Sequence, residues 1–197
     1  MTRRPEPKGW CPSSLRPMES GDGYIVRVKP AFGRVTRAQL KRVAQLADQV
    51  GNGIIELTNR ANLQLRGVSI SDHPALIDAL VQAELVDMAP ALDAAPQILV
   101  APNCDADIRN LYDNLRRAKL PNLPAKFGMV LEQGGQMLMQ ASGDIRLCAL
   151  GDKVVVWADG CRGGVCLPIS EAVGHVEKLA TWFAQHGDAD HRRMSQV

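Results

Sequence analysis

The sequence lacks the short motifs from which a reaction is usually assigned. It contains no Walker phosphate-binding loop, no HExxH zinc motif, no GxSxG nucleophile elbow and no CxxC pair. Its four histidines are dispersed along the chain, so the sequence offers no nucleophile–base pair. No reaction class can therefore be assigned from a motif alone.

A strong charge imbalance and long apolar runs are also missing. The 23 Lys and Arg residues nearly balance the 21 Asp and Glu residues, for a net charge of +2. This balance argues against a general affinity for nucleic acid or membrane surfaces. No apolar run approaches the length of a transmembrane helix, and the opening stretch MTRRPEPKGW has no apolar segment of the secretory type. We therefore expect a cytoplasmic protein with no nucleic-acid or membrane partner.

The chain also has few cysteines that could pair. Five cysteines, an odd number scattered along the chain, argue against a disulfide framework and are typical of a reducing compartment. Cys161 and Cys166 are close in sequence, as C-x4-C, and Cys148 lies on the strand predicted before them. A tetrahedral zinc site or an iron–sulfur cluster needs about four protein ligands. We therefore predict no metal site in this chain.

What the chain does contain is a polar set on a predicted hairpin, GIIELTNRANLQLRG, over residues 53–67. Alternating apolar residues predict two short strands joined by the turn 59–62. Polar side chains at alternate positions of the second strand point to one face. The set consists of Arg60, Asn62, Gln64 and Arg66. Two arginines and two amides form a receptor for an anion with several carboxylates, because the guanidinium fork binds carboxylate bidentately. The alternative is a set of solvated edge-strand residues.

The rest of the first half predicts an α+β unit. GYIVRVKP, residues 23–30, reads as a strand whose Val26 and Val28 face the core, so that Arg27 and Lys29 face outward together. Thr36 is a predicted N-cap, and helical spacing follows it. A second helix begins near Asp72. The order strand, helix, strand, strand, helix indicates a ferredoxin-like half-domain, in which the two basic sets can share one face of a single sheet.

The domain boundaries follow from these elements. We predict an N-terminal arm over 1–22, a ferredoxin-like half-domain over 23–101 that ends in the strand QILVA, a second α+β domain over 102–186, and a disordered tail over 187–197. In the second domain, a hairpin is predicted around Gly134-Gly135 and another across Gly151-Asp152.

Three stretches resemble a known family. CPSSLRPMESGDGYIVRVKP, from Cys11 to Pro30, is similar to the opening of the precorrin-3B synthases of aerobic cobalamin biosynthesis. TNRANLQLRG resembles the T-x-R-x-x-x-Q-x-x-G signature of the wider sirohaem nitrite and sulfite reductase family. LPAKFGMVLEQGGQ, followed by DIRL, is similar to the second domain of that family. The stretches occur in the family's order and cover most of the chain.

The resemblance implies a tetrapyrrole site. The residues matching Arg27, Arg60 and Gln64 contact the carboxylates of the macrocycle or the bound oxyanion in the reductases. A lysine matching Lys126 serves the substrate anion. The family's reaction on precorrin-3A is a dioxygen-dependent hydroxylation with lactone formation, and it uses a [4Fe–4S] cluster. The implied protein is an oxidoreductase that binds precorrin-3A or sirohaem.

The chain also departs from the family. Family members contain two copies of the two-domain unit, and the cluster cysteines belong to the second copy, which this chain lacks. Two family basic residues appear here as Pro96 and Gly128. The resemblance therefore implies the first half of a precorrin-3B synthase-like protein, with the redox centre supplied by a second half or a partner chain. The alternatives are a non-catalytic tetrapyrrole-binding homodimer and a subunit of a sirohaem-dependent nitrite or sulfite reductase.

Overall fold

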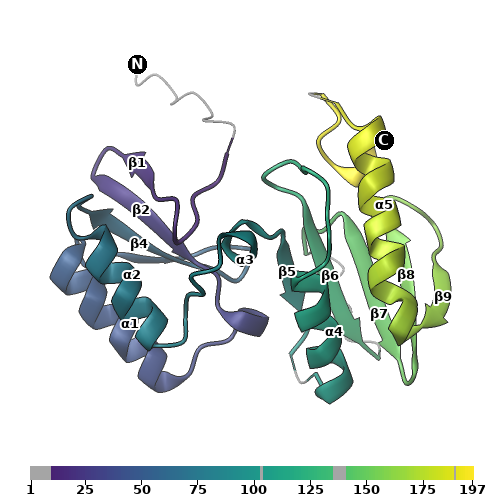
Figure 1. Cartoon of the computed structure of the whole chain (residues 1–197), viewed down its shortest axis with the longest axis horizontal. Coiled ribbons are helices and arrows are strands. Elements are labelled where there is room, and N and C mark those ends of the chain that lie inside the picture. Colours follow the sequence, from purple (N-terminus) through teal and green to yellow (C-terminus); the bar gives the residue numbers. More distant parts are fainter. Residues whose placement is uncertain (1–9, 103, 135–140, 189) are drawn as a thin grey trace.

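The computed structural model describes residues 10–102, 104–134, 141–188 and 190–197. Two α+β units lie side by side, each built on one sheet (Figure 1). The four-stranded sheet has the order β1-β2-β4-β3, and the five-stranded sheet has the order β5-β6-β7-β8-β9. The predicted α+β class with a ferredoxin-like half-domain is confirmed.

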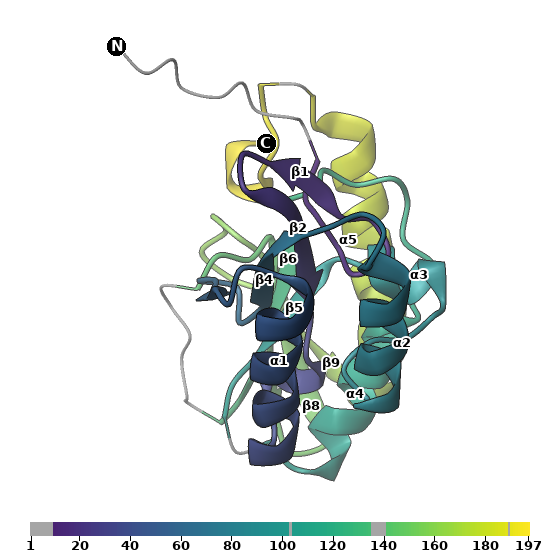
Figure 2. The ribbon, with the colours of Figure 1, turned by 90° about the vertical axis from the view of Figure 1, so that its left-hand side faces the viewer.

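The first unit contains the strands and helices predicted over residues 23–85, together with two elements that were not predicted, the short edge strand β1 and the short helix α3. In chain order these are β1 (Met18–Ser20), β2 (Gly23–Val28), α1 (Arg37–Val50), β3 (Ile55–Leu57), β4 (Leu63–Val68), α2 (His73–Gln82) and α3 (Pro90–Ala94). Thr36 caps α1 through a capping box with Gln39, as its sequence position predicts. Helices α1 and α2 run alongside each other (Figure 2).

The alternation of β2 and β4 separates an apolar face from a polar one. Val26 and Val28 are fully buried, and they lie opposite Leu65 and Leu63 of β4. Arg27, between the two valines, lies opposite Gln64. Because neighbouring residues on a strand point to opposite faces, these polar side chains point away from the α1/α2 core.

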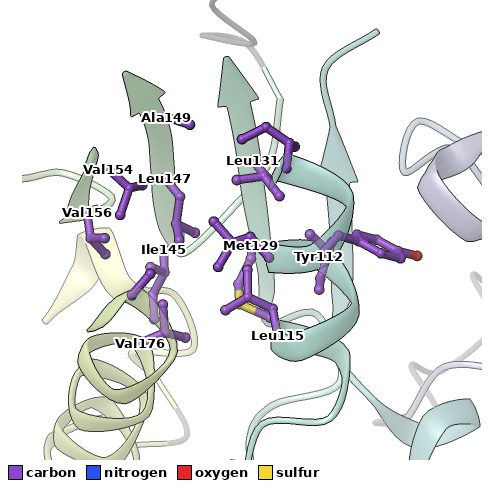
Figure 3. Close-up of a cluster of buried hydrophobic side chains, with 14 of the residues drawn as sticks. Tyr112, Leu115, Met129, Leu131, Ile145, Leu147, Ala149, Val154, Val156 and Val176 are labelled. Carbon is purple, nitrogen blue, oxygen red and sulfur yellow. The ribbon is translucent and has the colours of Figure 1, made fainter. Parts of the chain in front are cut away.

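The second unit is a mixed sheet with helices on one face. Its elements are β5 (Gln97–Val100), α4 (Ala106–Arg116), β6 (Gly128–Gln133), β7 (Ile145–Leu150), β8 (Lys153–Ala158), β9 (Val165–Pro168), α5 (Ala172–His186) and the 3-10 helix η3 (Met194–Gln196). β6 is parallel to both β5 and β7, and the remaining pairs are antiparallel. Leu115 of α4 and Val176 of α5 pack with Met129, Leu131 and Ile145 of the sheet (Figure 3). The hairpin predicted across Gly151-Asp152 joins β7 and β8.

The strand QILVA, which we expected at the end of the first unit, lies in the second sheet. β5 pairs in parallel with β6, and its Ile98 is buried in the core of the second unit. A parallel partner can be far away in sequence, so the local pattern of QILVA does not show which sheet it joins.

Two further expectations concern the end of the chain and a turn. The 187–197 segment, expected to be disordered, contains η3, and its Met194 is buried in the second core. The strand expected after Gly134-Gly135 falls mostly on residues 135–140, which lie outside the described residues. In the described sheet, β6 lies between β5 and β7. In the part of the chain that the structure describes, no helix is long and apolar enough to cross a membrane.

Candidate functional site

A large basic cleft lies where the two units meet. Its volume is about 820 Å³, and its walls come from the arm around residues 10–16, the end of β2, the 60–62 turn, the 90–97 segment and the loop after α4. We call it the junction cleft. Its basic lining residues are Arg16, Arg27, Lys29, Arg60, Arg116, Arg117 and Lys119. Among the lining residues, Asp93 is the one carboxylate. A concave surface with this excess of cations attracts anions strongly.

Arg60 connects the first unit to the second. It lies on a tight turn in which the Thr58 hydroxyl accepts hydrogen bonds from the backbone N–H groups of Arg60 and Asn62. Its Nη2 donates to the Phe127 carbonyl at 3.1 Å. Burial lowers the pKa of Arg60, and the positive charge of Arg193 lowers it further. The Arg60 Nε is buried and has no hydrogen-bond partner among the described residues.

Asn62 lies in the same turn as Arg60, directly before β4, and is 3% exposed. It lines the junction cleft, and its Oδ1 has no hydrogen-bond partner among the described residues. An unpaired buried polar atom costs about 1–3 kcal/mol. Such atoms on Arg60 and Asn62 at the wall of one cleft are typical of a site that completes its polar contacts with a ligand.

Arg27 is held in place by the neighbouring strand. Its Nε and Nη2 both donate to Gln64 Oε1, at 2.9 and 2.6 Å, while Gln64 Nε2 donates to Glu56 Oε2 at 2.7 Å. Arg27 and Glu56 lie opposite Gln64 on either side, so the three side chains form a row across β2, β4 and β3. Arg27 lines the cleft, whereas Gln64 lies behind it and orients the guanidinium.

Lys29 enters the junction cleft from the end of β2. Its Nζ donates to the carbonyl oxygens of Asp93 and Ala95, at 2.7 and 3.0 Å. Burial lowers the pKa of Lys29 below 10.5, against the opposing effect of the Asp93 charge. The ammonium therefore stays close to the cleft wall with its charge poorly solvated, and a ligand carboxylate would stabilise it.

Three residues of the predicted set lie outside the junction cleft: Gln64, which lies behind Arg27, together with Arg66 and Lys126. Arg66 donates to Asp22 at 2.9 Å and lies within 3.4 Å of Glu56, so acidic neighbours already neutralise its charge. Lys126 is exposed on the loop before β6 and is not among the lining residues. The structure thus brings Arg27, Lys29, Arg60 and Asn62 together around one cavity.

Sequence reasoning missed the basic residues contributed by other segments. Arg16 lies on the arm, where its guanidinium stacks 4.2 Å from the centre of the Trp10 ring. Arg116, Arg117 and Lys119 come from the end of α4 and the loop after it. Two arginines at the C-terminal end of a helix are already explained by their favourable interaction with the helix dipole. Their position in the cleft could therefore not be predicted from the sequence.

The cysteines do not form a cluster site. Cys148 and Cys166 lie opposite Val155 on either side, so a whole strand separates them, and Cys161 is exposed. Among the described residues, no group of three His, Cys, Asp or Glu side chains lies close enough to hold a metal ion. These residues therefore do not fit an iron–sulfur cluster, whereas the cationic cleft has the charge to bind a ligand with several carboxylates.

Comparison with known proteins identifies one domain of the chain. Residues 16–83 match the model of the "Nitrite/Sulfite reductase ferredoxin-like half domain". The chain contains a nitrite/sulfite reductase ferredoxin-like half domain. This half domain carries every residue of the predicted set except Lys126, and it contributes Arg16, Arg27, Lys29, Arg60 and Asn62 to the cleft.

The relatives of this chain described next are longer proteins than the chain itself. A precorrin-3B synthase of Sinorhizobium sp is 38% identical over 150 residues, which cover 73% of this chain and 33% of that protein. A ferredoxin–nitrite reductase of Leptolyngbya laminosa is 26% identical over 62% of this chain and 27% of that protein. The structure of the Mycobacterium tuberculosis NirA protein superposes with a TM-score of 0.68 at 14% identity, over 88% of this chain and 37% of that one. The chain thus spans about a third or less of the length of these curated relatives, and the likeness to NirA shows the fold.

Proposed function

We propose that the chain binds a tetrapyrrole, precorrin-3A or sirohaem, by its carboxylates in the junction cleft. It would do so as part of a precorrin-3B synthase-like protein of cobalamin biosynthesis. The observation that carries the proposal is the set of seven basic side chains around one cavity of about 820 Å³, with one carboxylate among the lining residues. The 38% identity to a precorrin-3B synthase favours this tetrapyrrole chemistry over a general anion site.

The residues of the cleft would each have a defined task. Arg27, oriented by Gln64, and Arg60, held on the Phe127 carbonyl, present guanidinium groups to carboxylate arms. Lys29 adds a point charge beside them. Trp10 supplies an aromatic surface on the arm side of the cavity. Binding, orientation and partial exclusion of water are therefore the contributions that this chain makes.

The oxygen-dependent hydroxylation and lactonisation that the resemblance implies requires a redox centre. The described cysteines do not assemble into a cluster site, so we derive no step through a cluster here. We propose that a second half-chain or a partner supplies that centre. Iron and sulfide analysis of the anaerobically purified protein, with a native mass, tests whether the chain carries such a group by itself.

The binding proposal is tested by titration with a metal-free octacarboxylate porphyrin, followed by its visible absorbance. Arg27→Ala removes a charge-assisted contact worth about 1.5–3 kcal/mol, so we expect an affinity about 10- to 150-fold weaker. Arg66→Ala is the matched control, because Arg66 is paired with Asp22 outside the cleft and should change affinity less than threefold. Absence of binding by the wild type, or equal losses in both variants, would reject the site.

A further inference from the structure

We infer that Arg193, in the segment near the end of the sequence, is a positioning residue for the guanidinium of Arg60, and that it acts through Asp144 and the Phe127–Gly128 peptide. The inference rests on the proposed function, because it assigns a further residue to the same anion site. Arg193 lies outside the matched half domain and does not line the junction cleft.

Asp144 is the centre of the contact. It is fully buried, and its Oδ1 accepts hydrogen bonds from Arg193 Nε at 2.8 Å and from the Met194 N–H at 2.9 Å. Its Oδ2 accepts from the Gly128 N–H at 2.9 Å, and its own N–H donates to the Gly128 carbonyl at 2.6 Å. A buried carboxylate is stable only when donors and an opposite charge surround it, and Arg193 provides that charge.

Gly128 links the Asp144 carboxylate to Arg60 at the cleft. The Phe127 carbonyl, which belongs to the same peptide unit as the Gly128 N–H, accepts the hydrogen bond from Arg60 Nη2. A Cβ at position 128 would overlap the Arg60 guanidinium, so the arginine lies directly against this backbone. The N–H of this peptide therefore donates to Asp144, and its carbonyl accepts from Arg60.

The segment that bears Arg193 is itself fixed in place. Arg193 Nη1 donates to the Ser142 hydroxyl at 2.9 Å, and its backbone N–H donates to Gln196 Oε1 at 2.9 Å. Met194 is buried in the second core, and a Cβ at Gly160 would come within 3.0 Å of Ser195. A segment anchored at these points can hold the Asp144 carboxylate in one position.

Positioning and simple electrostatics predict opposite results for Asp144. If only charge mattered, removing a carboxylate near Arg60 would strengthen the binding of an anion. If Asp144 and Arg193 position Arg60, the same change weakens binding, because the Phe127–Gly128 peptide loses its support. Asp144→Asn, which preserves volume, separates the two explanations.

The experiment measures the dissociation constant of the metal-free octacarboxylate porphyrin for the full chain and its variants. We expect Arg193→Ala and Asp144→Asn each to weaken binding at least fivefold. We also expect Arg193→Ala to add less than twofold in an Arg60→Ala background, because residues that act through one another are not additive. Arg37→Ala is the matched control, since it removes an exposed arginine that does not line the cleft.

Unchanged or tighter binding by Asp144→Asn would overturn the inference, as would losses from Arg60→Ala and Arg193→Ala that multiply. If Asp144→Asn does not fold, the Arg60/Arg193 pair of variants decides alone. If the wild type binds no porphyrin, the proposed function fails, but the inference can still be tested by stability. The changes in the free energy of unfolding caused by Arg60→Ala and Arg193→Ala should then be non-additive in the double variant. Additive changes would reject the inference.

Discussion

The close approach of Arg60 to Gly128 can be tested without any ligand. Gly128→Ala places a methyl group too close to the present position of Arg60 Nη2, and 3.0 Å from the Gln97 carbonyl oxygen. The guanidinium is the movable partner, so we expect it to leave its place and lose the hydrogen bond to Phe127. Gly128 does not have a positive φ, so the backbone itself accepts alanine.

The magnitude follows from two opposing effects. Loss of a hydrogen bond to a charged group costs about 1.5–3 kcal/mol. Replacing glycine by alanine in a strand stabilises by about 0.5–1 kcal/mol. We therefore expect the free energy of unfolding to fall by about 0.5–2.5 kcal/mol, measured by equilibrium urea unfolding with an unchanged m-value.

The variant Arg60→Ala provides the decisive background. With the guanidinium absent, Gly128→Ala should become neutral or stabilising, so the two changes should be strongly coupled. An equal cost of Gly128→Ala with and without Arg60 would refute the reasoning and identify the Gln97 carbonyl as the obstacle. A stabilised Gly128→Ala single variant would show that Arg60 does not lie on this peptide.

Two further predictions concern pH. Because burial lowers the pKa of Lys29 below 10.5, porphyrin affinity should fall as the pH rises through that lowered pKa. Lys29→Arg should move this fall in affinity to higher pH. A porphyrin affinity that stays constant up to pH 10.5 would contradict the prediction. The unfolded chain binds the proton more tightly, so the free energy of unfolding should rise with pH over the same range. Hydrogen bonds from Arg66 and, to a smaller extent, from Ser20 lower the pKa of Asp22 from 3.8 to about 2, so the stability from these contacts is present above pH 3.8 and is lost as the pH falls toward 2. An NMR titration of the Asp22 carboxyl should give this midpoint and return toward 3.8 in Arg66→Ala; a midpoint still near 2 would exclude Arg66 as the cause.

Local patterns in the sequence predicted the elements of the first unit well. The alternation around Val26 and Val28 gave the buried face of β2, and Thr36 gave the start of α1. These signals are carried by residues within a few positions of each other, where strand alternation and capping act. The turn at Arg60 was identified for the same reason.

Contacts between distant segments could not be predicted in this way. The sequence did not show that Arg66 is paired with a carboxylate, because its partner Asp22 lies 44 residues away on the β1–β2 turn. Asp144 and Arg193 are 49 residues apart, so the order of the 187–197 segment was missed. The cleft itself depends on how α4 and the arm lie against the first sheet, which no periodicity within one segment reveals.

The row formed by Arg27, Gln64 and Glu56 limits how this protein can vary. Gln64 accepts with its oxygen from a cation on one side and donates with its nitrogen to an anion on the other. A glutamate at position 64 would repel Glu56, a lysine would repel Arg27, and asparagine is shorter by one methylene. The three positions are therefore expected to change together during evolution, so that a substitution at one is accompanied by compensating changes at its neighbours.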